Sequence, residues 1–247
     1  MKKLCFNINY EPDKSEILSV INDRINSRTS GYICVADGNI LTMVHKDLEY
    51  RKVVQGSIFS IVDSSWVPLF VKCIYGYEWE QYCGSQIFDE ITKMHKYRMY
   101  FLGSQQNVLD ALRNNLAQIA PEISDMKFVE LPFCNVEDFN YEGIAVKINR
   151  DNPDVIWISL GAPKQEQFAA RLVKHLNRGV AIPVGAVFNF RAGLGIKRAP
   201  QWMVRMRLEF VYRLFSEPRK QLKRCYNIIS TLPAIIWEEY RKKSHLP

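Results

Sequence analysis

Cysteine motifs are missing from this 247-residue sequence, and their absence excludes two common kinds of stabilised site. The six cysteines are scattered, with no CxxC pair and no close cluster with any of the four histidines. This spacing excludes a cysteine-rich zinc module and a disulfide framework, and it suits a reducing compartment. We therefore predict no metal site, and we expect the histidines to be solvated or packed in the core.

Long apolar runs and several well-known site motifs are also missing. No stretch approaches the roughly 18 apolar residues of a transmembrane helix. The N-terminal residues MKKLCFNINYEPD lack the apolar core of a secretory signal. No GxGxxG, GxxxxGK[ST], HExxH or GxSxG pattern occurs, and no DxD triplet that would bridge a metal to a diphosphate. We expect a cytoplasmic protein that uses neither a metal nor a cofactor.

The sequence does contain an alternation of buried strands and amphipathic helices. Apolar residues make up 47% of the chain, enough for a substantial core. The alternation predicts an α/β fold with a Rossmann-like, largely parallel sheet flanked by helices. Residues 1–195 would form this domain, and residues 196–247 a basic, helical C-terminal appendage.

The expected elements follow from apolar periodicity and from glycine and proline at their ends. Strands are predicted at 4–9, 31–36, 57–62, 98–102, 127–133, 155–158 and 179–187. Helices are predicted at 15–26, 41–53, 84–94, 108–119, 141–149 and from 163 onward. The aromatic segment 66–82 is predicted to be irregular. In the tail, the apolar stretch 228–237 is interrupted by Ser230, Thr231 and Pro233. This stretch could lie in a membrane interface with basic residues beside it, and the tail equally suits a helical pair packed on the core.

The stretch DVIWISLGAPKQEQFAA, residues 154–170, predicts a buried strand, a tight turn and a helix start. Pro163 fits the first helical position, and Glu166 lies in the first turn, where a negative charge complements the helix dipole. Such a helix start suits a phosphate or a polar sugar, because backbone N–H groups and the dipole point at the ligand. Spacing alone is equally compatible with an ordinary strand-to-helix turn.

Positive charge is concentrated at the end of the chain. From residue 194 onward there are 12 Lys and Arg against 4 Asp and Glu, whereas the other 193 residues hold 21 against 22. The net charge of +7 therefore comes from the last fifth of the sequence. A basic tail implies an anionic partner, which could be a membrane surface, a nucleic acid or a diphosphate.

Small and polar residues follow the predicted strands, where ligands of open α/β sheets bind. Asp37 and Asp63 are the carboxylates at these ends, although a single Asp there is more often a helix cap or turn former. Group transfer to a hydroxyl needs a base, and a departing diphosphate needs positive charge. We predict Asp63 as the catalytic base. The predicted substrate-binding residues are Asp37, Asn39, Gly103, Gly161, Lys164, Gln165, Glu166, Gly185, Asn189, Arg198, Arg213 and Arg219.

Four ordered motifs, GAPKQE, VGAVFNFRAG, KRAPQWM and LEFVYRL…EPRK, resemble those of the WecG/TagA/CpsF glycosyltransferases (glycosyltransferase family 26). The resemblance covers roughly residues 31–226. It implies an inverting, metal-independent transfer of a sugar, often N-acetylmannosamine, from its UDP derivative to a polyprenyl-diphosphate-linked acceptor. It further implies action at the cytoplasmic membrane face in cell-surface polysaccharide synthesis, with a basic appendage that helps close the site.

The same resemblance suggests roles for individual residues. Asp63 matches the Asp of the family's PDG motif, its proposed base, and Gln165 matches a sugar-site glutamine. Of the family's TPN segment only Asn39 is retained, and Asn189 replaces the family's Asp near the nucleotide. Arg213 and Arg219 match arginines of the appendage.

The N-terminal half departs from the family pattern. The family's eRvtGsD is EQYCGSQ at residues 80–86, PDG is Val62-Asp63-Ser64, and hGYf is Leu131-Pro132-Phe133-Cys134. Because Asp63 and Gln165 survive, we infer a different sugar or acceptor before we infer lost activity.

Two alternatives to a catalytic protein stay open. The altered motifs also suit a non-catalytic family member that acts as a partner or regulator of another transferase. A nucleic-acid-binding protein rests only on the basic tail, whose interleaved aromatic and apolar residues suit a membrane or a lipid diphosphate equally well. The sequence leaves a homo-oligomer open.

Overall fold

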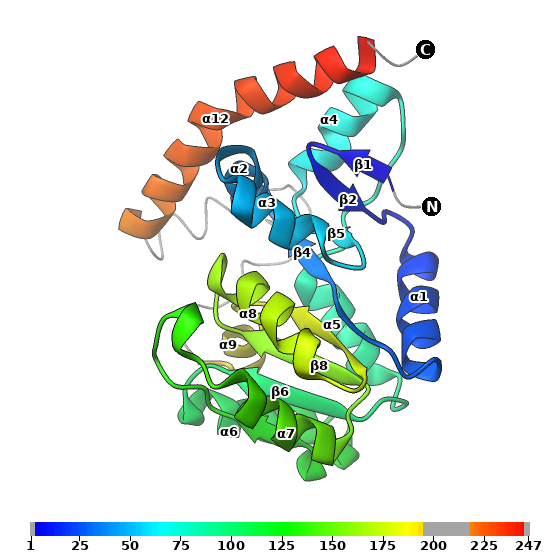
Figure 1. Ribbon diagram of the computed structural model, residues 1–247, viewed down its shortest axis with the longest axis vertical. Coiled ribbons are helices and arrows are strands. Elements are labelled where there is room, and N and C mark those ends of the chain that lie inside the picture. The colour runs from blue at the N-terminus through cyan, green and yellow to red at the C-terminus, as the bar shows by residue number, and fades with distance from the viewer. Residues whose placement is uncertain (1–2, 195–217, 245–247) are drawn as a thin grey trace.

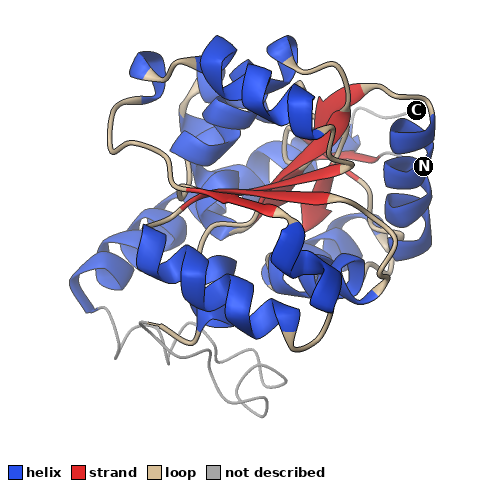
Figure 2. Cartoon of the chain, turned by 90° about the horizontal axis from the view of Figure 1, so that it is seen from below, coloured by secondary structure: helices blue, strands red, loops and turns tan. Residues whose placement is uncertain are grey.

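The computed structural model describes residues 3–194 and 218–244. Strands form a central layer, and helices cover both of its faces (Figures 1 and 2). The predicted α/β architecture with a largely parallel sheet and a C-terminal helix is confirmed.

The strands form two hydrogen-bonded groups in the orders β1-β2-β5-β4 and β3-β9-β8-β6-β7. β1 pairs antiparallel with β2, and the other pairs are parallel. β3 and β4 are separated by Ile33 alone, whose N–H donates to the Ala181 carbonyl at 3.0 Å, so this segment joins the two groups. The strands are β1 (Lys3–Cys5), β2 (Ile8–Tyr10), β3 (Ser30–Tyr32), β4 (Cys34–Ala36), β5 (Ser60–Val62), β6 (Met99–Gly103), β7 (Lys127–Val129), β8 (Val155–Ser159) and β9 (Gly179–Pro183).

The helices connect these strands and cover the sheet. They are α1 (Lys14–Asn26), α2 (Gly38–Lys46), α3 (Leu48–Gln55), α4 (Trp66–Tyr75), α5 (Gly84–Lys93), α6 (Gln106–Ala117), α7 (Tyr141–Asp151), α8 (Lys164–Leu172), α9 (Val187–Ala192) and α12 (Pro218–Ser244). One face packs against α2, α3, α4, α7 and α8, and the other against α1, α5, α6 and α9.

Successive side chains of the central strands point to opposite faces of the sheet, so each strand contributes to two separate cores. In β8, Ile156 and Ile158 join the core under α8, whereas Val155 and Trp157 join the core under α5 and α6. All four side chains are fully buried. A strand covered on both faces needs an unbroken apolar run, which is the pattern from which this strand was predicted.

Several predicted boundaries are wrong. The segment predicted to be irregular begins with helix α4, which ends at Gly76 in a left-handed conformation. The helix predicted at 41–53 is two helices separated by Asp47, which accepts N–H groups at the start of α3. The last predicted strand ends at Pro183, and Val187 begins α9. Pro163 precedes the first helical residue of α8 instead of occupying that position.

The described part of the appendage is one helix, α12, which lies across α2 and α4 (Figure 1). It continues through Pro233, and the part of the predicted appendage before residue 218 lies outside the described residues. Thr231, Ile235 and Glu239, at four-residue intervals, form its buried face. Tyr75 of α4 donates to Glu239 at 2.8 Å.

Candidate active site at the strand ends

The carboxyl ends of four neighbouring strands bring the predicted site residues to one edge of the sheet. Asp37 follows β4 and Asp63 follows β5, and these strands are paired in parallel. Gly161 follows β8 and Gly185 follows β9, which are also paired. Ser159 donates through its hydroxyl to the Gly185 carbonyl at 2.7 Å, which ties these two ends together. We call residues 161–166 with Gly185 the turn wall, and Asp37 with Asp63 the carboxylate wall.

The turn wall is internally hydrogen-bonded. Gly161 has a φ of +77° and donates its N–H to Gln165 Oε1 at 3.1 Å, while Gln165 N–H donates to the Gly161 carbonyl at 3.0 Å. Gln165 is only 5% exposed. Its Oε1 also lies beside Gly185, where an added Cβ would stand 3.4 Å away. The carboxamide of Gln165 is therefore held between the ends of β8 and β9.

Glu166 is a fully buried acid behind this turn. One carboxylate oxygen, Oε1, accepts from Gln165 Nε2 at 2.8 Å, and Oε2 accepts from the Tyr50 hydroxyl at 3.1 Å. Burial raises the pKa of Glu166 to about 7, although hydrogen bonds from Gln165 and Tyr50 favour its charged form and the charge of Asp37 opposes it. A carboxyl group that titrates near neutral pH inside a strand-end site is typical of functional sites.

On the carboxylate wall, Asp37 caps a helix and contacts the appendage. Its Oδ1 accepts from the N–H groups of Asn39 and Ile40, both at 2.9 Å, which fixes the start of α2. Its Oδ2 forms an ion pair with Arg224 of α12. Asp37 thus has the capping role that a lone Asp often has, and it also joins the sheet edge to α12.

Asp63 connects the end of β5 to the start of α5 through hydrogen bonds. Its Oδ1 accepts from Gly84 N–H at 2.8 Å, and its carbonyl accepts from Gln81 Nε2 at 2.6 Å. The residue is partly exposed. Gln81 and Gly84 belong to the segment in which the sequence departs from the family pattern, so this departure lies directly beside the predicted base.

The remaining predicted residues each have contacts of their own. Gly103, with a φ of +90°, ends β6 so close to β8 that an added Cβ would stand 2.6 Å from the Ser159 carbonyl oxygen. Asn189 accepts from the Ser104 hydroxyl at 3.3 Å. Lys164 donates to the Cys134 carbonyl and stands over the rings of Phe133 and Phe139. Arg198, Arg213 and the side chain of Arg219 lie outside the described part of the chain.

Two residues at this edge were not among the predicted set. Tyr50 lies on α3, more than one hundred positions from Glu166, and its sequence context reads as an ordinary apolar helix position. Arg224 was counted only as part of the basic tail, and no local pattern separates it from the neighbouring basic residues. Only the packing of α3 and α12 shows their contacts with the site.

The structure is an α/β fold with a carboxylate and a helix start at the same strand-end edge, an arrangement typical of proteins that bind nucleotides or phosphates. A sequence model of the glycosyl transferase WecG/TagA/CpsF family matches residues 5–245. The chain therefore belongs to the WecG/TagA/CpsF family of glycosyltransferases, as its motifs indicated.

Three curated relatives share the name N-acetylglucosaminyldiphosphoundecaprenol N-acetyl-beta-D-mannosaminyltransferase. The protein from Bacillus subtilis (strain 168) is 27% identical over 226 residues, which cover 90% of this chain and 86% of that protein. A protein of Bacillus spizizenii (strain ATCC 23059 / NRRL B-14472 / W23) is 23% identical, over 87% of this chain and 82% of its own. A protein from Staphylococcus aureus (strain NCTC 8325 / PS 47) is 28% identical over a shorter region, which covers 53% of this chain and 50% of that protein.

Proposed function

We propose that this glycosyltransferase moves a sugar from a UDP-sugar to a polyprenyl-diphosphate-linked saccharide in bacterial cell-surface polysaccharide synthesis, such as that of teichoic acid, capsule or exopolysaccharide. The observation that carries the proposal is the shared edge, where the Asp63 carboxylate and the start of α8 lie at the ends of strands in one continuous layer. The names of the relatives, which specify a diphosphoundecaprenol-linked acceptor, support this acceptor class.

In the proposed reaction, Asp63 accepts the proton of an acceptor hydroxyl. The hydroxyl oxygen then attacks the anomeric carbon, and the bond between this carbon and the UDP oxygen breaks, with inversion. Gln165 and Asn39 orient the sugar, while Arg213, Arg219 and Arg198 neutralise the departing diphosphate. A positioned base of this kind contributes about 10² to 10⁴ in rate.

We propose that the transfer needs no metal ion, because the sequence lacks the DxD triplet that would bridge a metal to the diphosphate. Turnover should be unchanged by EDTA and should not rise when Mg²⁺ or Mn²⁺ is added back. Loss of turnover in EDTA, with recovery in one of these ions, would contradict this part.

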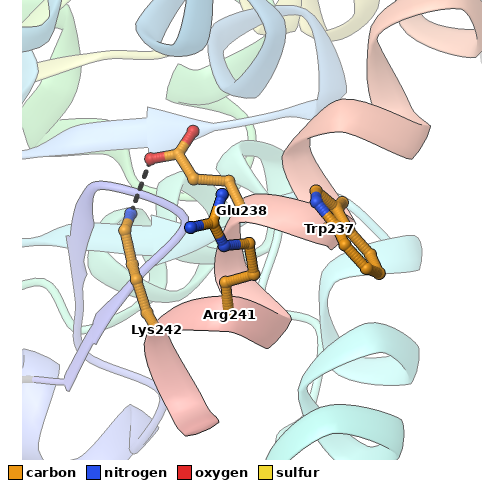
Figure 3. A pocket seen from close by; sticks show the side chains of 4 residues that line it. All are labelled: Trp237, Glu238, Arg241 and Lys242. Atoms are coloured by element: carbon orange, nitrogen blue, oxygen red, sulfur yellow. Dashed lines mark ion pairs between the residues drawn. The ribbon is translucent and has the colours of Figure 1, made fainter. Parts of the chain in front are cut away.

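We also propose a peripheral position at the inner face of the cell membrane. The outward face of α12 exposes apolar and aromatic side chains at intervals of three, four and eight residues, namely Leu222, Tyr226, Ile229, Trp237 and Tyr240. A surface pocket of about 300 Å³ on the same helix places Trp237 beside Arg241 (Figure 3). Apolar residues with basic neighbours are typical of helices that lie in a membrane interface. Within the described residues, no helix is long and apolar enough to cross a membrane.

The membrane proposal is tested by sedimentation with liposomes that contain anionic lipid. Deletion of residues 196–247 should abolish both liposome binding and turnover. The paired substitutions Ile229→Glu and Trp237→Glu should reduce binding, and Lys52→Glu, on the exposed face of α3, serves as the matched charge control. Equal sedimentation of the deletion variant and the full chain would refute the proposal.

The transfer itself is tested with a panel of UDP-sugars and a lipid-diphosphate-linked sugar acceptor. UDP-N-acetylmannosamine and UDP-N-acetylglucosamine are the first donors to compare. The wild-type protein should turn over at least one donor, and Asp63→Asn should lose that turnover while it keeps its fold. Wild-type protein that turns over no donor would favour the alternative, a non-catalytic partner of another transferase.

A further inference from the structure

We propose that Glu166 is a positioning residue that fixes the carboxamide of Gln165 for donor binding, with Tyr50 as its support. The proposal rests on the function proposed above, because Gln165 is the residue assigned to the sugar. The added element is a buried group that does not itself react but affects the affinity for the donor.

The hydrogen bonds determine which end of the Gln165 amide faces which neighbour. Nε2 donates to Glu166, and Oε1 accepts from Gly161 N–H. A reversed amide would place its NH₂ against the Gly161 N–H and its oxygen against the Glu166 carboxylate, so both contacts would become repulsive. The observed orientation leaves Gln165 one further N–H and one further lone pair for a ligand.

Tyr50 holds Glu166 in place from a different layer of the fold. Its ring is 2% exposed, and its hydroxyl donates to the second carboxylate oxygen of Glu166 at 3.1 Å. Each oxygen of this buried carboxylate therefore has a donor. A fully buried carboxylate with a single partner would be costly, so the Tyr50 contact is needed to keep the charge at this position.

The strength of the bond between Glu166 and Gln165 depends on the charge of Glu166. A hydrogen bond to an ionised carboxylate is roughly twice as strong as one between neutral groups. The other titratable groups that face Glu166 are Tyr50 on α3, Cys34 on β4 and Asp37 at the end of β4. Burial raises the pKa of both Tyr50 and Cys34 above the physiological range, and Asp37 is paired with Arg224. Glu166 is thus the group of this cluster whose pKa lies near 7.

The first test compares donor KM and kcat across pH 5.5 to 8.5 in the wild type, Glu166→Gln and Tyr50→Phe. In the wild type, donor KM should rise as pH falls through about 7, when Glu166 becomes protonated. Glu166→Gln should lack this rise and should have a KM roughly tenfold higher at pH 8, as expected for one weakened charged hydrogen bond. Tyr50→Phe removes a bond that lowers the Glu166 pKa, so the rise should move to higher pH.

Tyr75→Phe is the matched control, because Tyr75 of α4 also donates to a glutamate, Glu239 of α12, at 2.8 Å. It should show the wild-type pH profile. A Glu166→Gln variant with unaltered KM and an unaltered profile would overturn the proposal.

A second test does not depend on turnover. The side-chain amide signals of Gln165 in ¹⁵N-labelled protein, assigned with Gln165→Glu, should titrate with a midpoint near pH 7 in the wild type and not in Glu166→Gln. Absence of this titration in the wild type would overturn the proposal. If the wild type turns over no donor but the titration is present, the proposed function fails while the control of Gln165 by Glu166 stands.

Discussion

The turn wall and the carboxylate wall lie at the same sheet edge but are built differently. In the turn wall, Gln165 and Glu166 are buried, and both their side chains hydrogen-bond to groups of the fold. In the carboxylate wall, Asp37 and Asp63 are partly exposed and contact loops and helix starts. A buried side chain that is hydrogen-bonded on both sides is held in one conformation. A residue on a loop can keep its backbone conformation while its neighbours are substituted.

This difference fits two of the three departures from the family pattern, those at 62–64 and 80–86, whereas the third, at 131–134, contacts Lys164 of the turn wall. The GAPKQE turn is retained. Within it, Gln165 accepts a hydrogen bond from Gly161, and Glu166 accepts one from Tyr50 of α3. The altered segment at 80–86 is the approach to α5 and its first residues, beside Asp63, where Gln81 contacts a backbone carbonyl that other donors could also satisfy. We infer that the carboxylate wall is where specificity for sugar or acceptor can vary without loss of the fold.

The largest expected effect is a loss of kcat on the carboxylate wall, in contrast to a loss of donor affinity on the turn wall. Asp63→Asn should lower kcat by about 10² to 10⁴ with little change in donor KM, because the proton acceptor is lost but the contact with Gly84 N–H can persist. Gln165→Ala should mainly raise donor KM. Steady-state kinetics with circular dichroism as a fold control would test this, and undiminished kcat in Asp63→Asn would remove its role as base.

The second prediction concerns the glycines that bring the strand ends together. Gly103→Ala places a Cβ 2.6 Å from the Ser159 carbonyl oxygen at a φ of +90°, so it should lower the free energy of unfolding by at least about 3 kcal/mol. Gly161→Ala, where nothing lies within 4 Å of the added Cβ, should cost only the backbone strain of about 1 to 2 kcal/mol. Urea denaturation measures both, and equal losses would contradict the close approach at Gly103.

The third prediction is the pH dependence of stability that Glu166 imposes. Its pKa is about 7 when folded, against an ordinary 4.5, so between these values the folded protein binds this proton more tightly than the unfolded chain. The free energy of unfolding should therefore fall as pH rises from 4.5 to 7 and then level off. Glu166→Gln should lack this contribution, which is about 3 kcal/mol. Unfolding curves of the two proteins that stay parallel from pH 4.5 to 8 would show that Glu166 does not titrate here.

The fourth prediction tests the contact of the carboxylate wall with α12. Arg224→Gln removes the ion pair with Asp37, whose partners are 28% and 26% exposed, so the loss should be about 1 kcal/mol or less. We expect turnover to fall roughly fivefold and limited proteolysis to cleave α12 faster. The control Lys72→Gln removes an exposed ion pair with Glu78 and should change neither measurement. A wild-type proteolysis rate in Arg224→Gln would argue against the contact.

The smallest expected effect is at Lys164, within the turn wall. Its ammonium donates to the Cys134 carbonyl and stands over two aromatic rings, so it has structural partners in addition to any ligand. If these partners are its main role, Lys164→Met should change donor KM less than about threefold. A tenfold rise in KM would instead support the prediction that Lys164 binds the donor.

The sequence by itself determined the elements whose pattern is set by local physics. The run Val155–Ile158 predicted a strand buried on both faces, and glycines at the end of β6 and after β8 and β9 marked the ends at which a ligand is expected. It failed where local signals conflict with packing. Helix α4, in the segment predicted to be irregular, has a proline in its first turn and three aromatic residues, but its apolar side chains pack in the core.

Only the tertiary structure decided which distant groups share the site. Glu166 read as a residue of the first helical turn, and nothing in the sequence indicated that Tyr50 would donate to it or that Arg224 would pair with Asp37. Burial and hydrogen bonding depend on how α3, α8 and α12 pack around the strand ends, and these contacts join residues separated by 116 and 187 positions. Local periodicity specifies each element, whereas the pKa of a buried carboxyl depends on the elements that surround it.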